Sequence, residues 1–429
     1  MTAALRLLGP SALRGTLEVP GDKSVSHRAL LFNALAGGSA TIRGLLDSSD
    51  VKATARCLGQ MGIHIDGGRV DGRNGTLLPP SYALDCGNSG TTARLLMGAL
   101  ASQSFPALMD GDRSLRRRPM GRVTEPLGRM GVRFLSGSTG LPLTIHGGSL
   151  INGTHRSPVA SAQVKTALML AGLRAEGTFR FEEPTLSRDH SERMLSAMGV
   201  VFDSQRLGDG THVLTLEGGQ RIAPLDISVP GDVSSAAFFM VAAAICPGSD
   251  LTILNVGLNP TRSGVIDVLL RMGAALTVEE RGGAGGEPVG DIRVRHSTLR
   301  ATDIEGDEIP RLIDEVPVLA VAAAHAEGTT RIRQAGELRV KESDRIKASV
   351  ALCRQLGVDA EESEDGFSVE GGGPGPTAPA NMDATGDHRV AMASAVASLA
   401  SKGETHIRGH QSVASSFPNF FRLLESVRA

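Results

Sequence analysis

The chain has 429 residues, of which 41% are hydrophobic and 21% charged, and its formal net charge is −2. This length exceeds what one hydrophobic core usually supports, so we expect a globular protein with two domains. A nearly neutral chain with 3% aromatic residues lacks both the basic surface and the stacking side chains of a nucleic-acid binder. An anion site must therefore be a local cluster of Arg and Lys.

Targeting and redox signals are missing from the sequence. The first residues contain no long apolar segment, and no run approaches the ~20 apolar residues of a membrane span. The four cysteines lie far apart and form no paired motif: Cys57, Cys86, Cys246 and Cys353. We therefore expect a cytoplasmic protein with reduced thiols and with no membrane segment, disulfide or metal site.

One motif occurs twice. Residues 19–24 read Val-Pro-Gly-Asp-Lys-Ser and residues 229–234 read Val-Pro-Gly-Asp-Val-Ser, and an apolar stretch that predicts a helix follows each. We expect these helices to end near Gly38 and Gly248, at the same spacing from their motifs. The Asp and Ser residues of both motifs are typical helix caps. The chain is therefore predicted to contain two related halves with a boundary near residue 230.

Smaller units recur within each half. A helix of small and apolar residues ends at a Gly or a short polar turn, and alternating β-branched residues then predict a strand. This pattern occurs at residues 36–42, 175–181, 326–332 and 401–407. We expect roughly three such units per half, with buried helices and an outer sheet. The Gly-rich residues 282–286 and 371–375 are interpreted as hairpin loops rather than interdomain linkers.

The two copies of the motif differ in charge. Where the second copy has Val233 and Phe238, the first has Lys23 and Arg28, and His27 adds a third basic side chain. Cations in the first turns of a helix oppose the helix dipole, so their presence favours an anionic ligand at this helix start. A solvated basic helix end is the alternative.

Four further clusters are anion-site candidates: residues 88–92, 112–120, 338–345 and 387–392. Their alternatives are an ordinary helix cap, a solvated loop and exposed ion pairs. Arg118 precedes a proline, which holds it extended and aims its guanidinium. Lys341 and Arg345 are expected to lie one helical turn apart.

Three carboxylates accompany these cations. Asp314, Glu315 and Glu342 are candidates for general acid and base chemistry. Cations beside carboxylates suit proton transfer on a bound phosphorylated substrate. We therefore expect an enzyme that acts on a small anionic molecule.

These motifs together resemble one family along essentially the whole chain. The motifs lie at residues 20–28, 88–91, 118–122, 161–165, 187–190, 313–315, 341–345 and 387–389. In this order they resemble the 5-enolpyruvylshikimate-3-phosphate synthase family, in its bacterial class II form.

The resemblance implies an α/β fold of two inverse domains, each built from three βαβαββ repeats with buried parallel helices and outer sheets. Domain I would contain residues 1–20 plus 231–429, and domain II residues 21–230. The chain would cross the hinge twice, and the active site would lie in the interdomain cleft and close on its substrates.

The resemblance also implies a reaction. The enolpyruvyl group of phosphoenolpyruvate would pass to the 5-hydroxyl of shikimate 3-phosphate through a tetrahedral ketal, with release of phosphate. No cofactor or metal would be needed, and a monomer without nucleic-acid or membrane partners is expected. Glyphosate would be an inhibitor, because Gly90 leaves room for it where Ala would obstruct it.

Site residues follow from the same resemblance. Catalysis would rest on Asp314 as the base for the 5-hydroxyl, Glu342 as the acid and base for the methylene carbon, and Lys23. Phosphoenolpyruvate would contact Lys23, Gly90, Arg118, Gln163, Arg345 and Arg389. Shikimate 3-phosphate would contact Lys23, Ser24, Arg28, Ser161, Ala162, Gln163, Ser187, Arg188, Asp314 and Lys341.

Three positions depart from the better-known class I pattern. Ala162, Ser415 and Glu337 stand where that pattern has Ser, Lys and Asn.

Two rival functions remain. A UDP-N-acetylglucosamine enolpyruvyl transferase would usually carry a reactive Cys in the loop at residues 110–118, which has none. A non-catalytic RNA- or nucleotide-binding protein would need a basic, aromatic surface.

Overall fold

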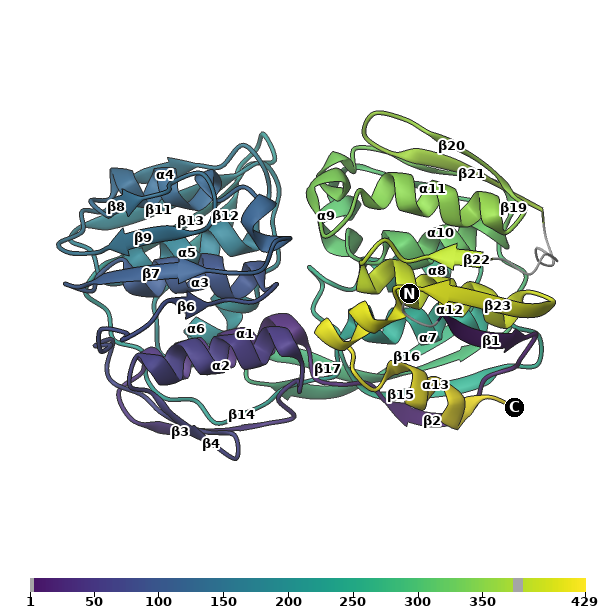
Figure 1. Cartoon of the computed structure of the whole chain (residues 1–429), viewed down its shortest axis with the longest axis horizontal. Coiled ribbons are helices and arrows are strands. Elements are labelled where there is room, and N and C mark those ends of the chain that lie inside the picture. Colours follow the sequence, from purple (N-terminus) through teal and green to yellow (C-terminus); the bar gives the residue numbers. More distant parts are fainter. Residues whose placement is uncertain (1–3, 373–380) are drawn as a thin grey trace. The chain divides into compact units, whose positions relative to one another are not determined.

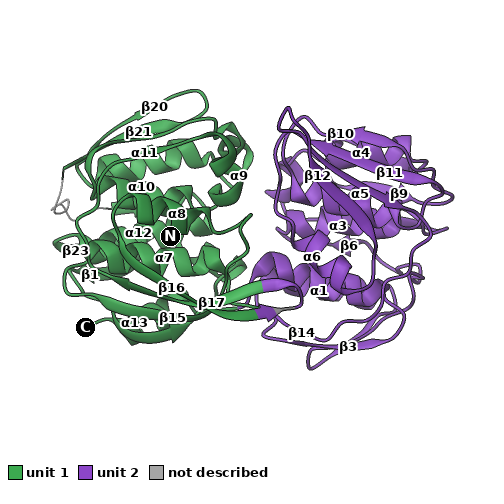
Figure 2. Ribbon diagram, turned by 180° about the vertical axis from the view of Figure 1, so that it is seen from behind, with its two compact units in different colours: residues 1–20, 230–282, 288–429 green, residues 21–229, 283–287 purple. Residues whose placement is uncertain are grey.

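A computed structural model describes residues 4–372 and 381–429 (Figure 1). The chain forms two compact units, coloured separately in Figure 2. Unit 1 comprises Met1–Pro20, Pro230–Gly282 and Pro288–Ala429, and unit 2 comprises Gly21–Val229 and Gly283–Glu287. Each unit has its own hydrophobic core.

Unit 2 contains three four-stranded sheets with one common topology. In each sheet the first two strands pair in parallel and the other pairs are antiparallel, as βαβαββ repeats require. In spatial order the sheets are β14 (Ile227–Ser228), β3 (Ser39–Arg43), β5 (Arg69–Asp71), β4 (His64–Asp66); β6 (Leu84–Asp85), β7 (Pro106–Asp110), β9 (Leu143–His146), β8 (Arg133–Ser136); and β10 (Thr154–Arg156), β11 (Thr178–Glu183), β13 (His212–Glu217), β12 (Phe202–Arg206).

Unit 1 repeats this topology. Its sheets are β16 (Ala275–Ala284), β17 (Glu287–Arg295), β15 (Asp250–Gly257), β2 (Arg14–Glu18); β18 (Asp303–Ile304), β19 (Glu327–Ile332), β21 (Phe367–Gly372), β20 (Asp359–Glu362); and β1 (Leu5–Gly9), β23 (Gly403–Arg408), β22 (Asn381–Asp383). The third sheet has three strands among the described residues. The four strands predicted after a helix-ending turn are confirmed as β3, β11, β19 and β23.

Three buried helices form the centre of each unit. They are α1 (Lys23–Leu35), α3 (Gly90–Leu100) and α5 (Ala162–Gly172) in unit 2, and α7 (Val233–Ile245), α10 (Val316–Ala324) and α12 (His388–Ala400) in unit 1. The side chains of these helices are buried at almost every position, so the helices lack the single apolar stripe that is typical of a surface helix. The remaining helices are α2 (Ser49–Gln60), α4 (Gly121–Arg129), α6 (His190–Ala197), α8 (Gly264–Arg271), α9 (Ile309–Leu312), α11 (Arg345–Gln355) and α13 (Phe420–Val427).

The duplicated motif marks the places where the chain passes between units. Strand β2 belongs to a sheet of unit 1 and leads into α1 of unit 2, whereas β14 of unit 2 leads into α7 of unit 1. A side chain on Gly21 would place its Cβ 2.0 Å from the Gly44 carbonyl oxygen, so this crossing requires glycine. Asp22 and Asp232 cap the two helices as predicted. Ser24 and Ser234 lie in the first turn and do not cap it.

One loop interpretation needs correction. The chain turns at residues 285–286 between β16 and β17, as expected of a hairpin, but Gly283–Glu287, which include the adjoining strand ends, belong to unit 2 while the rest of both strands belongs to unit 1. The chain therefore passes between the units at this hairpin as well (Figure 2). Of the second Gly-rich stretch, Gly371 and Gly372 end β21, and the rest lies outside the described residues. Across residues 4–372 and 381–429, no helix is long and apolar enough to cross a membrane.

Candidate active site

Hydrogen bonds join the first turns of α1, α3 and α5 in unit 2. The His27 Nδ1 atom lies 2.7 Å from the Thr54 hydroxyl of α2, which lies 2.7 Å from the Thr92 hydroxyl of α3. Gln163 of α5 donates to the Thr91 hydroxyl of α3 at 2.9 Å. Helix N-termini present unpaired N–H groups and the positive end of the dipole. The three helix N-termini that meet here therefore form a favourable binding place for an anion.

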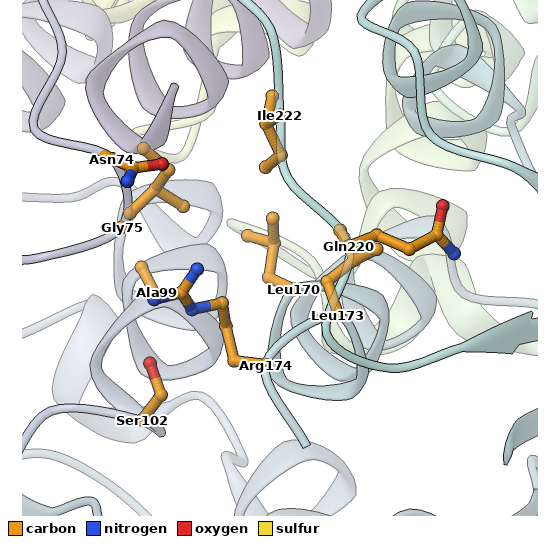
Figure 3. A pocket seen from close by; sticks show the side chains of 10 residues that line it. Asn74, Gly75, Ala99, Ser102, Leu170, Leu173, Arg174, Gln220 and Ile222 are labelled. Atoms are coloured by element: carbon orange, nitrogen blue, oxygen red, sulfur yellow. The ribbon is translucent and has the colours of Figure 1, made fainter. Parts of the chain in front are cut away.

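The opposite ends of the same helices also meet. Leu35 ends α1, Ala99 lies near the end of α3 and Leu170 near the end of α5, and all three line a cavity of about 20 Å³ (Figure 3). The three helices therefore run in parallel. Since the cavity lies at their C-terminal ends, it is separate from the anion-favouring end.

Lys23 and Arg28 of α1 have different surroundings. The Lys23 ammonium lies 3.2 Å from an Asp50 carboxylate oxygen and stays partly exposed. The Arg28 guanidinium is buried and donates to the Ser24 carbonyl and to the Thr166 hydroxyl, both at 3.0 Å. Burial lowers the pKa of Arg28 to about 10, which leaves it charged at neutral pH. Arg28 thus links α1 to α5, and Lys23 is the more exposed of the two cations.

His27 does not supply the third cation that the sequence suggested. Burial, helped by the positive charges of Lys23 and Arg28, lowers the pKa of His27 to about 3. The imidazole is therefore neutral, and the cationic cluster at this helix start consists of Lys23 and Arg28.

The buried imidazole predicts a pH-dependent stability. Its pKa falls from 6.5 to about 3 on folding, so the unfolded chain binds the proton more readily and stability declines as the pH falls through this interval. The loss approaches about 1.4 kcal/mol per pH unit. We expect His27→Asn to flatten this decline, measured by urea unfolding between about pH 7 and about pH 5. Equal slopes in both proteins would contradict the assignment.

Gly90 is the first residue of α3, after the Ser89 cap. Arg118 is extended before its proline, as predicted, and its Nη2 donates to the Asn88 side chain at 2.7 Å. Arg94, one turn after Gly90, donates from Nη1 to the Gln163 side chain at 2.7 Å. The structure therefore brings Gly90, Arg118 and Gln163 together, and Arg94 joins them. Arg94 was missed because a lone Arg in a helix carries no distinguishing signal.

The residues expected to hold shikimate 3-phosphate lie around α5 and α6. Ser161 caps α5 and Ala162 is its first residue. Ser187 and Arg188 lie in the turn between β11 and α6, where Ser187 is buried. The helix starts of α1 and α5 and this turn thus supply Ser24, Ser161, Ala162, Ser187 and Arg188 within one unit.

Unit 1 also brings three helix starts together, but its own carboxylates occupy them. The Ser234 hydroxyl of α7 donates to Glu315, which lies just before α10. Arg389 of α12 donates to the Asp314 carbonyl at 3.0 Å and to the Glu315 carboxylate at 3.4 Å. Asp387 caps α12 by accepting the Arg389 backbone N–H at 2.9 Å. The two units therefore offer different chemistry, with basic side chains at the helix starts of unit 2 and a carboxylate cluster at those of unit 1.

Arg345 is the centre of that carboxylate cluster. Its guanidinium, in a side chain 1% exposed, donates to Asp387 at 2.8 Å, to Asp314 at 3.0 Å and to Glu342 at 2.7 Å. Burial opposes the charge, but these three carboxylates raise the pKa of Arg345 above its ordinary value. Two of the proposed catalytic groups, Asp314 and Glu342, are therefore held by one cation.

Lys341 is not placed as the sequence suggested. Helix α11 begins at Arg345 with Asp344 as its cap, and Lys341 lies earlier, at the end of a 3-10 turn (Gly336–Val340). The two cations are not one helical turn apart, yet both reach Asp314: Lys341 Nζ lies 3.6 Å from its carboxylate. The helix predicted to include Lys341 starts later because Asp344 caps α11, where its side chain accepts a hydrogen bond from a free backbone N–H group of the first turn.

Arg262 is a further cation that sequence reasoning missed. It is 3% exposed, donates to Asp232 at 3.2 Å and lies 3.9 Å from the carboxylates of both Asp314 and Glu315. The residues next to Arg262 in the sequence form no recognisable motif, so only the folded structure shows that Arg262 lies beside these carboxylates. In the part of the chain that the structure describes, no group of His, Cys, Asp or Glu side chains is arranged to hold a metal ion.

Residues 7–424 match the family model described as EPSP synthase (3-phosphoshikimate 1-carboxyvinyltransferase). The chain is 49% identical over 424 residues to a 3-phosphoshikimate 1-carboxyvinyltransferase from Desulforamulus reducens, with 97% of each chain covered. A solved EPSP synthase from Acinetobacter baumannii is similar with a TM-score of 0.86 and 43% identity, over 99% of this chain and 97% of that chain.

A more distant structure has the same fold. The enolpyruvyl transferase NikO from Streptomyces tendae matches with a TM-score of 0.77 and 22% identity, over 99% of this chain and 97% of that chain. At this identity the likeness shows the fold alone. The predicted enolpyruvyl transferase fold is confirmed.

Proposed function

This chain belongs to the EPSP synthase family, and we propose that it transfers the enolpyruvyl group of phosphoenolpyruvate to the 5-hydroxyl of shikimate 3-phosphate, releasing phosphate. The observation that carries the proposal is the cluster around Arg345, in which Asp314 and Glu342 stand beside a fixed positive charge. Family membership supports the choice of substrates, and the carboxylates of the cluster are the proposed acid and base groups.

The substrates are proposed to bind at residues of both units. Phosphoenolpyruvate would contact Lys23, Gly90, Arg118 and Gln163 of unit 2 and Arg345 and Arg389 of unit 1. Shikimate 3-phosphate would contact Ser24, Arg28, Ser161, Ala162, Ser187 and Arg188, with Lys23 and Gln163 shared and Asp314 and Lys341 from unit 1. The Arg345 guanidinium that would contact phosphoenolpyruvate also holds three carboxylates of unit 1.

The proposed chemistry has two stages. Asp314 takes the proton of the 5-hydroxyl as that oxygen attacks C2 of phosphoenolpyruvate, while Glu342, in its protonated form, gives its proton to the methylene carbon, which yields the tetrahedral ketal. The Glu342 carboxylate then removes a proton from the new methyl group, the bond from C2 to the phosphate oxygen breaks and the double bond is restored, and the departing phosphate takes up the proton held by Asp314. Lys23 stabilises the negative charge of the phosphate. We also propose a monomer in the cytoplasm, without cofactor, metal or nucleic acid.

Phosphate release tests the proposal. Purified protein is given phosphoenolpyruvate with shikimate 3-phosphate or, in parallel, with UDP-N-acetylglucosamine. We expect turnover only with shikimate 3-phosphate. Turnover only with the UDP-sugar would identify the sister reaction, and no turnover with either acceptor would favour a binding protein.

Gly90→Ala is expected to weaken phosphoenolpyruvate binding and to confer glyphosate resistance. A Cβ at this position would lie 2.8 Å from Nη1 of Arg94 and 3.3 Å from Nη1 of Arg118. Both atoms end flexible side chains, so the variant folds but its guanidinium groups move. We expect the KM for phosphoenolpyruvate to rise about tenfold, equivalent to ~1.4 kcal/mol, and the glyphosate inhibition constant to rise further.

Gly128→Ala is the matched control, because nothing lies within 4 Å of a Cβ built there. Steady-state kinetics with and without glyphosate should give wild-type constants for this control. An unchanged inhibition curve for Gly90→Ala would rule out the steric explanation.

A further inference from the structure

Lys165 is a fully buried lysine in α5 that is not itself among the residues assigned to either substrate. Its Nζ atom lies 2.8 Å from a Glu183 carboxylate oxygen and 2.5 Å from a Glu192 carboxylate oxygen. The side chain of Lys165 is 1% exposed, and those of the two glutamates are 0% and 7% exposed. Burying three charged groups costs several kcal/mol per ion before their attraction is counted.

This cluster forms hydrogen bonds with the backbone of one turn at two points. Lys165 Nζ donates to the Ser187 carbonyl oxygen at 3.3 Å, and the Glu183 carboxylate accepts the Ser187 backbone N–H at 3.0 Å. Glu183 ends β11 and Glu192 lies in α6, so the cluster holds both ends of the turn that carries Ser187 and Arg188. Both peptide groups around Ser187 are thereby held by charged partners.

Lys165 is expected to stay protonated and positively charged at neutral pH. Burial opposes the ammonium form, but Glu192 and Glu183 raise the pKa of Lys165 above its ordinary value. Ammonium hydrogen bonds to carboxylates are shorter and stronger than neutral ones. A buried cluster of this kind is often no more stabilising than well-packed apolar side chains, so its presence suggests that it specifies a geometry.

We propose that Lys165 is a positioning residue for the acceptor substrate, holding the Ser187–Arg188 backbone so that this turn meets the phosphate of shikimate 3-phosphate. The inference rests on the proposed function, which assigns the acceptor to Ser187 and Arg188. Lys165 acts on the Ser187 backbone, directly and by way of Glu183, and takes no part in proton transfer. Removing it should therefore weaken acceptor binding and leave phosphoenolpyruvate binding intact.

Two variants separate positioning from simple stability. Lys165→Met leaves two buried carboxylates without a partner and is expected to unfold readily. The triple variant K165M/E183Q/E192L removes every charge of the cluster, so it should fold. In the triple variant we expect the KM for shikimate 3-phosphate to rise at least about tenfold, equivalent to ~1.4 kcal/mol, with the KM for phosphoenolpyruvate unchanged. Amide hydrogen exchange of residues 184–189 should become faster.

Gln103→Leu is the matched control. Gln103 is buried in the same unit and also holds a loop backbone, donating to the Gly75 carbonyl and accepting the Leu77 N–H, both at 3.0 Å. We expect this variant to lose stability while both KM values stay at the wild-type level.

The outcomes distinguish the two proposals. A folded triple variant with the wild-type KM for shikimate 3-phosphate would overturn the role of Lys165 while the proposed function stands. A wild-type protein that fails to turn over shikimate 3-phosphate would overturn the proposed function, and this inference with it.

Discussion

Asp314→Asn is expected to lower kcat by about 10²–10⁴, the usual contribution of a positioned general base. The change keeps the shape of the side chain but removes its capacity to accept the 5-hydroxyl proton. Two cations that contact the carboxylate, Arg345 at 3.0 Å and Lys341 at 3.6 Å, hold it in a defined orientation. Stopped-time phosphate release at saturating substrate measures kcat, and equilibrium binding of shikimate 3-phosphate shows whether the acceptor still binds.

Asp267→Asn is the control for this prediction. Asp267 is a partly exposed aspartate of the same unit that pairs with Arg311 at 2.6 Å, so its loss should leave kcat at the wild-type value. Wild-type turnover by Asp314→Asn would place the base elsewhere, with Glu342 as the next residue to test.

Arg345→Met is expected to lower the free energy of unfolding by about 3–5 kcal/mol, the usual cost of leaving buried charges without their partner. Asp387, at 0% exposure, Asp314 and Glu342 all rely on this guanidinium. Burial opposes the charge of Asp387, yet the neighbouring Arg345 lowers the pKa of Asp387 below its ordinary value. Urea unfolding gives the midpoint and the slope from which the free energy follows.

Arg339→Met provides the comparison. Arg339 also bridges two carboxylates, Asp344 at 2.8 Å and Glu362 at 2.9 Å, but its side chain is 29% exposed. Water therefore screens the charges, and we expect a loss of at most about 1 kcal/mol. Equal losses for the two arginines would show that burial does not decide the strength of these ion pairs.

Several features of the fold could be predicted because their causes are local. Asp22 and Asp232 cap helices with oxygens that reach N–H groups only two or three residues away. Arg118 is extended because the proline beside it excludes the helical conformation. Strand β3 follows α1 after a Gly turn, as the residues there indicate. Such signals lie in residues that are close in the sequence. The repeated motif in addition predicted that the two halves of the chain are related.

The helix expected to include both Lys341 and Arg345 shows where local reasoning ends. The four-residue spacing of the two cations predicted one continuous helical turn, but the Asp344 cap starts α11 only at Arg345. The two cations still meet, because both approach Asp314, which lies before α10. The correct partner was remote in sequence, so spacing alone could not identify it.

The sequence by itself determined the type of fold, and it predicted two related halves and the residues of the candidate site, since motifs, caps and glycine turns act over a few residues. Only the tertiary structure decided how each charge behaves. Lys23, His27 and Arg28 are neighbours on one helix, yet one is partly exposed, one is neutral with a pKa of about 3, and one is a buried brace. The physical reason is that burial and charge partners come from segments far along the chain, and these set solvation and Coulomb energy.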